Sequence, residues 1–372
     1  MSRLEELIEK LCPNGVEVKK LREVSYMQRG TSLTKAKAVD GDIPVISGGK
    51  EPAFYCNSSN RDGETITVAG SGAGAGYVQY WNIPIFANDC FTVKGNEFTE
   101  TKYLYYFMTN IQDKISDTKK GGGVPHVHIS DVENFSLPVP PLEVQREIVH
   151  ILDSFTLLTA ELTAELTAEL TARKKQYDFY CNKLLTFESD IPLLLLGEVC
   201  DLQAGKAIKA TEIYDVETNQ ATIPCYGANG LRGYVEKSNQ EGDKSIIGRQ
   251  GAQCGNVCYA TGKYYATEHA VVVTDKGHFN SRYLFHALTH ANLNQYKTAG
   301  AQPGLSVAKL NDVIIAVPDR KIQDKIANVL DNFEAICTDL NIGLPAEIEA
   351  RQKQYEYYRD LLLTFAETDR QS

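Results

Sequence analysis

Residues 139–153 read VPPLEVQREIVHILD, and residues 317–331 read VPDRKIQDKIANVLD. The two stretches align without a gap at an offset of 178. Further along, the same register matches RKKQY at 173–177 with RQKQY at 351–355, and LLTF at 184–187 with LLTF at 362–365. A poorly matched segment precedes each stretch. The chain therefore consists of a globular segment followed by a helical segment, and this pair occurs twice.

Both helical segments carry apolar residues at spacings of three and four, which is the period of an α-helix. The run extends from Ile148 to Leu184 in the first copy and from Ile326 to Leu362 in the second. In the second copy, Gly343-Leu344-Pro345 is expected to break or kink the helix. Two similar apolar stripes bury most simply against each other as an antiparallel coiled coil. The alternative is that each helix lies separately on its own domain.

The first helical segment contains a tandem repeat, Thr-Ala-Glu-Leu three times over residues 159–170, with leucines at Leu162, Leu166 and Leu170. One such unit adds about 6 Å of helical rise and a rotation of about 40° beyond a full turn. A base pair of B-DNA advances about 3.4 Å and turns about 34–36°. We interpret the repeat as a spacer in which one unit corresponds to one or two base pairs. The alternative is a simple helix-forming tract.

Both globular segments contain short β-prone runs bounded by Gly, Asn and Asp, including residues 65–68, 245–247 and 270–273. Each also contains a predicted helix, over 101–114 and 281–296, whose aromatic residues are expected in the core. The predicted fold class is α+β. Two mixed α/β domains are separated by two long helices that form an antiparallel coiled coil, with a pseudo-twofold internal repeat.

A glycine-rich stretch, AGSGAGAG at residues 69–76, corresponds to GRQGAQCG at 248–255. Two glycine pairs coincide, Gly72 with Gly251 and Gly76 with Gly255. A phosphate-binding loop needs its glycine pattern and a following helix, and neither repeats here. A turn with fixed glycines and variable contents is instead typical of a specificity loop.

The variable residues of this turn have side chains that suit base recognition. Arg249 can bind guanine, and Gln250 or Gln253 can bind adenine, through paired hydrogen bonds in the major groove. Ser71 is the candidate in the first copy. An ordinary solvated turn is the alternative. Further candidates are basic residues that suit phosphate contacts, although plain surface residues are equally consistent: Arg29, Lys35, Lys37, Lys119, Lys120, Lys206 and Lys209.

The formal net charge is −10, and most of the excess acid lies in the helical segments. Residues 141–188 contain five basic and eight acidic residues, and residues 319–367 contain six and ten. The globular segments are nearly balanced. A chain with this charge is expected to bind nucleic acid only together with a basic partner.

The remaining composition excludes several other classes of protein. The nine cysteines include no Cys-x-x-Cys pair, which indicates reduced, structural thiols. His286 and His290 have the spacing of a zinc pair but lack the accompanying glutamate, so no metal site is expected. No apolar run approaches the length of a membrane span, and no signal peptide is evident. We expect a cytoplasmic protein without a membrane partner.

Three motifs carry a family resemblance: Leu-x-Glu-Val at 21–24 and 196–199, Pro-x-x-x-Gln from Pro141 to Gln145, and Arg-Lys-Lys-Gln-Tyr at 173–177. Together with the Thr-Ala-Glu-Leu tract, they resemble the specificity subunit of type I restriction-modification systems over the whole chain. The resemblance implies the following division: an N-terminal segment (1–20), target recognition domain 1 (21–140), a first spacer helix region (141–188), target recognition domain 2 (189–318), a second spacer helix region (319–367) and a tail (368–372).

The resemblance further implies a subunit without catalytic residues, in which each recognition domain reads half of a bipartite, asymmetric site on double-stranded DNA. The helices would set the gap and dock methyltransferase subunits, two in number, and restriction subunits would join the full complex. No cofactor is expected on this chain, and S-adenosylmethionine is expected on the methyltransferase partner. Two alternatives remain: an S-adenosylmethionine-dependent DNA methyltransferase that uses the loop at 70–76, and a coiled-coil tether of two protein-binding modules.

Overall fold

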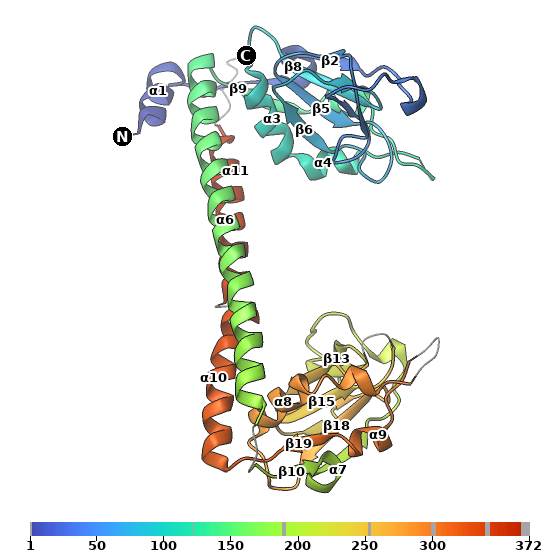
Figure 1. The fold of residues 1–372 in the computed structure, drawn as a ribbon. Coiled ribbons are helices and arrows are strands. Elements are labelled where there is room, and N and C mark those ends of the chain that lie inside the picture. The colour runs from blue at the N-terminus through green and yellow to red at the C-terminus, as the bar shows by residue number, and fades with distance from the viewer. Residues whose placement is uncertain are drawn as a thin grey trace. The chain divides into compact units, whose positions relative to one another are not determined.

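The computed structural model describes residues 2–121, 123–187, 191–251, 254–298, 303–338 and 343–365. The chain forms two compact units. Unit 1 comprises Met1–Ala164 and Glu349–Ser372, and unit 2 comprises Glu165–Ile348. Each unit contains one globular domain and a pair of helical segments (Figure 1). The finer domain boundaries drawn from the sequence remain a prediction.

Unit 1 is built around a four-stranded antiparallel sheet in the order β2-β8-β5-β6. The central strand β5 (Thr65–Ala69) is buried at every position, including its two threonines. A three-stranded sheet, β4-β3-β7, and the antiparallel pair β1-β9 complete the domain. The other strands are β1 (Glu17–Lys20), β2 (Ser25–Arg29), β3 (Ile43–Ile46), β4 (Phe54–Cys56), β6 (Val78–Trp81), β7 (Phe86–Ala87), β8 (Cys90–Gly95) and β9 (Ser136–Val139).

Unit 2 repeats this plan, which confirms the predicted internal repeat. Its main sheet has the order β11-β18-β15-β16, a second sheet has the order β13-β12-β17-β14, and β10 pairs with β19. The strands are β10 (Leu193–Leu195), β11 (Cys200–Ala204), β12 (Ile223–Gly227), β13 (Gly230–Val235), β14 (Gln240–Glu241), β15 (Lys244–Gly248), β16 (Val257–Ala260), β17 (Lys263–Ala266), β18 (Ala270–Asp275) and β19 (Ile314–Ala316). The predicted runs at 245–247 and 270–273 thus lie in β15 and β18.

One helix packs on the main sheet of each unit, α3 (Thr101–Asn110) on one and α8 (Ser281–His290) on the other. Their aromatic residues Tyr103, Phe107 and Tyr283 lie in the cores, as predicted. The shorter helices are α1 (Arg3–Leu11), α2 (Leu21–Val24), η1 (Lys35–Lys37), α4 (Gln112–Asp117), α5 (Ile129–Val132), α7 (Leu196–Val199), η2 (Ala210–Glu212), η3 (Leu293–Tyr296) and α9 (Val307–Asn311).

The lengths predicted for these core helices are wrong. The predicted helix 101–114 is interrupted at Ile111, because the side chain of Gln112 turns toward the end of the glycine-rich stretch. Its Oε1 accepts a hydrogen bond from Val78 N at 3.0 Å, and its Nε2 donates to Gly76 O at 2.8 Å. The predicted helix 281–296 ends at His290 and is followed by Asn292 in the left-handed region, with φ at 47°.

The first long helix, α6 (Leu142–Leu185), is continuous over 44 residues, as predicted. The second helical segment is divided, as the Gly-Leu-Pro sequence predicted, into α10 (Arg320–Thr338) and α11 (Leu344–Leu362). Residues 339–342, between them, lie outside the described residues.

In each unit, α6 runs antiparallel to its helical partner (Figure 1). In unit 1, Phe155 lies 5.8 Å from Tyr358 between ring centroids, and Thr156 Oγ1 lies 3.0 Å from Tyr355 Oη. In unit 2, Tyr180 stacks on Phe333 at 5.1 Å. The two ring pairs are equivalent in the repeat, since Phe155 and Phe333, like Tyr180 and Tyr358, are separated by the offset of 178. The predicted antiparallel coiled coil is thereby confirmed.

Candidate nucleic-acid interface

The glycine-rich turn of each unit connects two antiparallel strands. In unit 1 it joins β5 to β6, and in unit 2 it joins β15 to β16. Neither turn precedes a helix, so the loop lacks the helix N-terminus that a nucleotide-phosphate site uses. The methyltransferase alternative loses its structural basis in this loop.

The coincident glycines of the two turns have left-handed backbone conformations. The φ angles are 82° at Gly72, 86° at Gly251, 83° at Gly76 and 92° at Gly255. Glycine adopts this region without steric cost, whereas other residues are strained there. The repeat therefore keeps the glycines that shape the turn and varies the residues between them.

Three backbone hydrogen bonds hold each turn to two other segments of its domain, in a pattern that we call the loop frame. In unit 1 they are Gly70 N to Asp89 O (3.1 Å), Gly72 N to Pro125 O (3.0 Å) and Val127 N to Gly70 O (3.1 Å). In unit 2 they are Arg249 N to His269 O (2.9 Å), Gly251 N to Pro303 O (3.0 Å) and Leu305 N to Arg249 O (2.9 Å). The same backbone scaffold therefore occurs twice.

The side chains on the loop frame differ between the units. Equivalent hydrogen bonds and bridges pair four positions: Gly70 with Arg249, Ser71 with Gln250, Asp89 with His269, and His126 with Gly304. The repeated glycines in the sequence pointed to Ser71 and to the Arg249-Gln250 pair, but not to the segments that contain Asp89, His126, His269 and Gly304. The equivalence of Asp89 and His269 is hidden in the sequence, because one residue is inserted at Glu268-His269. This insertion shifts the offset between the two copies from 179 to 180.

The predicted base readers of unit 2 lie on the loop frame. Gln250 is exposed and lines a cavity of about 330 Å³ together with Asn229, His269 and Gly304. Arg249 is half-buried, and its Nε has no hydrogen-bond partner among the described residues. Gln253 lies outside the described residues. In unit 1, the Ser71 hydroxyl donates a hydrogen bond to Asp89 Oδ2.

The predicted phosphate contacts have varied surroundings. Arg29 lines a cavity of about 200 Å³ that also contains Asp89 and His126. Lys120 is paired with Asp131, and its hydrogen bond holds the pKa of that carboxyl below the ordinary range. The side chains of four further lysines are exposed: Lys35 and Lys37 on η1, Lys119 and Lys206.

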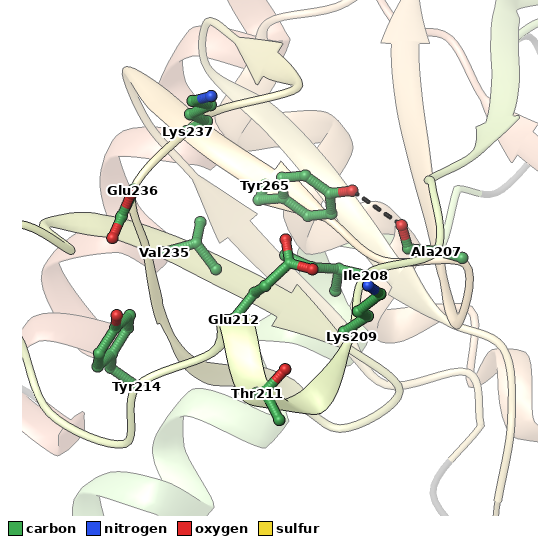
Figure 2. Close-up of a pocket in the computed structure, with 10 residues that line it drawn as sticks. All are labelled: Ala207, Ile208, Lys209, Thr211, Glu212, Tyr214, Val235, Glu236, Lys237 and Tyr265. Atoms are coloured by element: carbon green, nitrogen blue, oxygen red, sulfur yellow. Dashed lines mark hydrogen bonds between the residues drawn. The ribbon is translucent and has the colours of Figure 1, made fainter.

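Lys209 lies at a pocket of unit 2 with a volume of about 600 Å³ (Figure 2). The pocket is bounded by the segment that leads into η2, by the end of β13 and by Tyr265 of β17. The Tyr265 hydroxyl donates to Ala207 O at 3.2 Å. Lys209 and Lys237 line this pocket together with Glu212 and Glu236, so its formal charges balance (Figure 2). A net attraction for phosphate is therefore not built into it.

The two equivalent glutamines of the repeat, Gln145 and Gln323, fasten each helix to its domain, a role that the sequence did not reveal. Gln145 is fully buried; its Nε2 donates to Pro140 O at 2.7 Å and to Phe98 O at 2.9 Å, and its Oε1 accepts from Glu100 N at 2.9 Å. Gln323 makes the same three bonds, to Pro318 O (2.8 Å), His278 O (2.9 Å) and Asn280 N (2.7 Å).

A second contact, about two helical turns further on, differs between the units. In unit 1, Asp153 accepts hydrogen bonds from Lys102 Nζ at 2.8 Å and from the Tyr106 hydroxyl at 2.5 Å. In unit 2, the equivalent Asp331 contacts Arg282 at 2.7 Å and His286 Nε2 at 2.6 Å. Burial acts to raise the pKa of Asp331, but the bonds from Arg282 and His286 outweigh it and lower that pKa.

His286, Asp331 and Glu334 have ligand atoms within 4.8 Å of one another, a spacing that suits a metal ion. The Arg282 guanidinium, however, already contacts both carboxylates. His290, which has the spacing of a zinc pair with His286, instead contacts another residue: its Nε2 lies 3.0 Å from Asn182 Oδ1. The arrangement is that of an ion-pair network at the helix junction.

Unit 2 is expected to lose stability in mild acid through His286. Burial lowers the pKa of this imidazole below the unfolded value of about 6.5. The unfolded chain therefore binds a proton that the folded chain excludes, and stability falls as pH drops below about 6.5, by at most about 1.4 kcal/mol per pH unit. Thermal denaturation of His286→Gln between pH 7.5 and 5.5 should show a flatter dependence than the parent chain. The exposed His150, changed to Gln, is the control; equal slopes for the two variants would contradict the assignment.

A sequence family described as the type I restriction modification DNA specificity domain matches the chain twice, at residues 13–172 and 193–350. The type I restriction enzyme EcoprrI specificity subunit of Escherichia coli is 35% identical, with 91% of this chain and 92% of that protein covered. A putative specificity subunit of Haemophilus influenzae is 31% identical, with 98% of each covered.

Two solved structures share the fold. A chain from a study of complex assembly and conformational transition of the type I restriction-modification system has a TM-score of 0.65 at 19% identity, covering 94% of this chain and 98% of that one. The type I S subunit from M. genitalium has a TM-score of 0.54 at 20% identity, covering 93% and 94%.

A domain that occurs twice, each time followed by a helical segment, is the architecture of the solved type I specificity subunits that share this fold. The chain belongs to the family of type I restriction-modification specificity subunits, as its sequence predicted. Within the described residues, no helix is long and apolar enough to cross a membrane.

Proposed function

We propose that this chain is the non-catalytic subunit that selects the DNA target, and that each unit reads one half of a bipartite, asymmetric site. The loop frame carries this proposal. Identical backbone hydrogen bonds hold the turn in both units, while the side chains at the equivalent positions differ. A common backbone scaffold that carries different side chains suits two domains that bind different DNA sequences.

The charge distribution supports a partner that contributes much of the DNA affinity. The chain carries a net charge of −10, so the phosphate backbone must be neutralised largely by another subunit. We assign this role to methyltransferase subunits, which would also bind the S-adenosylmethionine. Restriction subunits would complete the assembly.

Exposed apolar residues at equivalent positions of the helices support two copies of one docking partner. In unit 1, Leu158 is 59% exposed and Tyr357 is 64% exposed. At the offset of 178, their counterparts in unit 2 are Ile336, 41% exposed, and Phe179, 59% exposed. Large exposed apolar residues that recur at equivalent positions are typical of protein interaction sites.

We further propose that α6 sets the unread gap between the half-sites. The Thr-Ala-Glu-Leu tract lies wholly within this uninterrupted helix, and its leucines Leu162, Leu166 and Leu170 are half-buried. In unit 1, Leu162 and Thr159 line a cavity of about 200 Å³ with Arg351 and Tyr355 of α11. A change in the number of repeats would change the helix length without altering either loop frame.

The proposal is tested by adding the methyltransferase subunit of the same system to the purified chain and sequencing the methylome of a strain that carries both. One bipartite target with a fixed gap is expected, together with retention of the corresponding duplex by the complex. Binding of S-adenosylmethionine by the chain alone would revive the methyltransferase alternative. Failure of the complex to retain any duplex would favour the alternative that the chain is a coiled-coil tether of two protein-binding modules.

Replacement of Arg249 by alanine should weaken binding to the correct half-site by about 1–3 kcal/mol if the guanidinium binds guanine. Competition binding of the complex with duplexes that differ at single positions would measure the loss. Lys263→Ala removes one positive charge from an exposed position of the same unit and serves as control. An equal loss on all sequences would identify Arg249 as a phosphate contact.

A further inference from the structure

Each loop frame includes a residue outside the glycine-rich turn that lines the cavity beside it. In unit 1 this position is Asp89, just before β8, and in unit 2 it is His269, just before β18. Their main-chain carbonyls accept the hydrogen bonds from Gly70 N and Arg249 N. Both side chains also line the cavity beside the turn, of about 200 Å³ in unit 1 and 330 Å³ in unit 2.

We infer that Asp89 and His269 are specificity-determining residues, and that Asp89 binds an exocyclic amino group of a base, in the first instance cytosine N4. This inference rests on the proposed function, since it assumes that the loop frames face the DNA. It adds a second segment of each domain to the reading surface, about 18 residues beyond the turn in the sequence.

The chemistry of Asp89 favours a base over the DNA backbone. The carboxylate is exposed, and no basic side chain forms an ion pair with it among the described residues. An unpaired carboxylate at this surface repels phosphate, so a favourable contact requires a hydrogen-bond donor. In the major groove the amino group of cytosine is the donor that Asp and Glu bind.

The Ser71 hydroxyl orients this carboxylate. It donates to Asp89 Oδ2, which leaves the lone pairs of Oδ1 available as acceptors. Oδ1 also lies close to Gly70: a Cβ at that glycine would be 3.4 Å from it and 3.3 Å from the Asp89 carbonyl oxygen. Ser71 thus supplies a hydrogen-bond donor to Asp89, and Gly70 leaves room beside it. Both differ from their counterparts in unit 2, Gln250 and Arg249.

At the equivalent position in unit 2, the hydrogen-bonding chemistry is different. His269 Nε2 lies 3.2 Å from Glu268 Oε1, and the inserted Glu268 occurs only in this copy. The neighbours of His269 at the cavity are the amides of Gln250 and Asn229 instead of a serine. A carboxylate only accepts hydrogen bonds, whereas an imidazole also donates one, so the two units offer different groups to a base edge, which is consistent with an asymmetric target.

The test uses the full chain in complex with its methyltransferase subunit. Asp89→Asn replaces a pure acceptor by an amide, which pairs with adenine N6 and N7. The variant should lose roughly 5- to 150-fold in affinity for the parental duplex and gain preference for adenine at one position of one half-site. Methylome sequencing and competition with duplexes randomised in each half would show the change. His269→Asn should alter one position of the other half-site only.

Asp113→Asn is the matched control, because it removes a carboxylate from an exposed position of α4 in the same unit. A parental target for Asp89→Asn, with affinity equal to that of the control, would overturn the inference while the bipartite function stands. A uniform change in affinity for all duplexes would equally overturn it, since it would indicate an electrostatic effect on backbone binding. Absence of any bipartite target for the parent complex would instead refute the proposed function.

Discussion

Deletion of residues 163–166, one Thr-Ala-Glu-Leu unit of α6, is expected to shorten the unread gap by one or two base pairs and to leave both half-sites unchanged. The physical reason is geometric: four residues contribute about 6 Å of rise and about 40° of excess rotation. The parental duplex should then be bound only weakly, because its two halves no longer present their edges to both loop frames at once. Methylome sequencing of a strain with the deletion would give the new gap.

An insertion of one further unit is the reciprocal variant and should lengthen the gap by the same amount. Glu165→Gln keeps the helix length and removes an exposed charge from the same tract, so its target should be parental. Altered half-site letters with the old gap would show that the tract does not determine spacing. The same conclusion would follow if insertion and deletion both left the gap as it was.

The long-range architecture was predictable from the sequence because it depends on periodicity and repetition. The apolar residues at spacings of three and four in 148–184 predict a helix whichever segment covers its apolar face. The similar apolar face of the second helical segment is the partner that covers it. Even the break near Pro345 followed from local chemistry, since proline is excluded from a helix interior. The ring pairs Phe155–Tyr358 and Tyr180–Phe333 then follow from the repeat itself.

The lengths of the core helices were not predictable, because tertiary contacts decide them. Residues 101–114 have helical propensity throughout, yet the hydrogen bonds of Gln112 to Val78 and Gly76 end the helix at Asn110. Those partners lie more than thirty residues away in the chain. The helical propensity of residues 101–114 therefore could not predict this contact.

The candidate site was predictable only where it lies within one segment. The turn with Arg249 and Gln250 is visible as a pair of repeated glycines. Asp89 and His269 reach it through backbone hydrogen bonds, which any residue type can form. Because those bonds do not depend on the side chain, only the folded structure shows that positions 89 and 269 are equivalent.

Replacement of Gln145 by alanine is expected to lower the free energy of unfolding by about 3–5 kcal/mol. The change removes three hydrogen bonds at a fully buried side chain and leaves the Glu100 amide and the carbonyls of Phe98 and Pro140 without that partner. It also leaves a cavity. Urea denaturation followed by the fluorescence of Trp81, the single tryptophan, would report the effect in unit 1.

Gln352→Ala is the control, because it shortens an exposed glutamine on α11 in the same unit and should change stability by about 0.5 kcal/mol or less. Gln145→Glu separates the two parts of the contact: it retains the acceptor for Glu100 N but replaces the donor, so two carbonyls face a carboxylate. It should therefore be at least as destabilising as the alanine variant at neutral pH and less so in acid, where a protonated carboxyl donates again. A loss no larger than that of Gln352→Ala would mean that apolar contacts of Ile148 and Leu152, both fully buried, hold the helix to the domain without the glutamine.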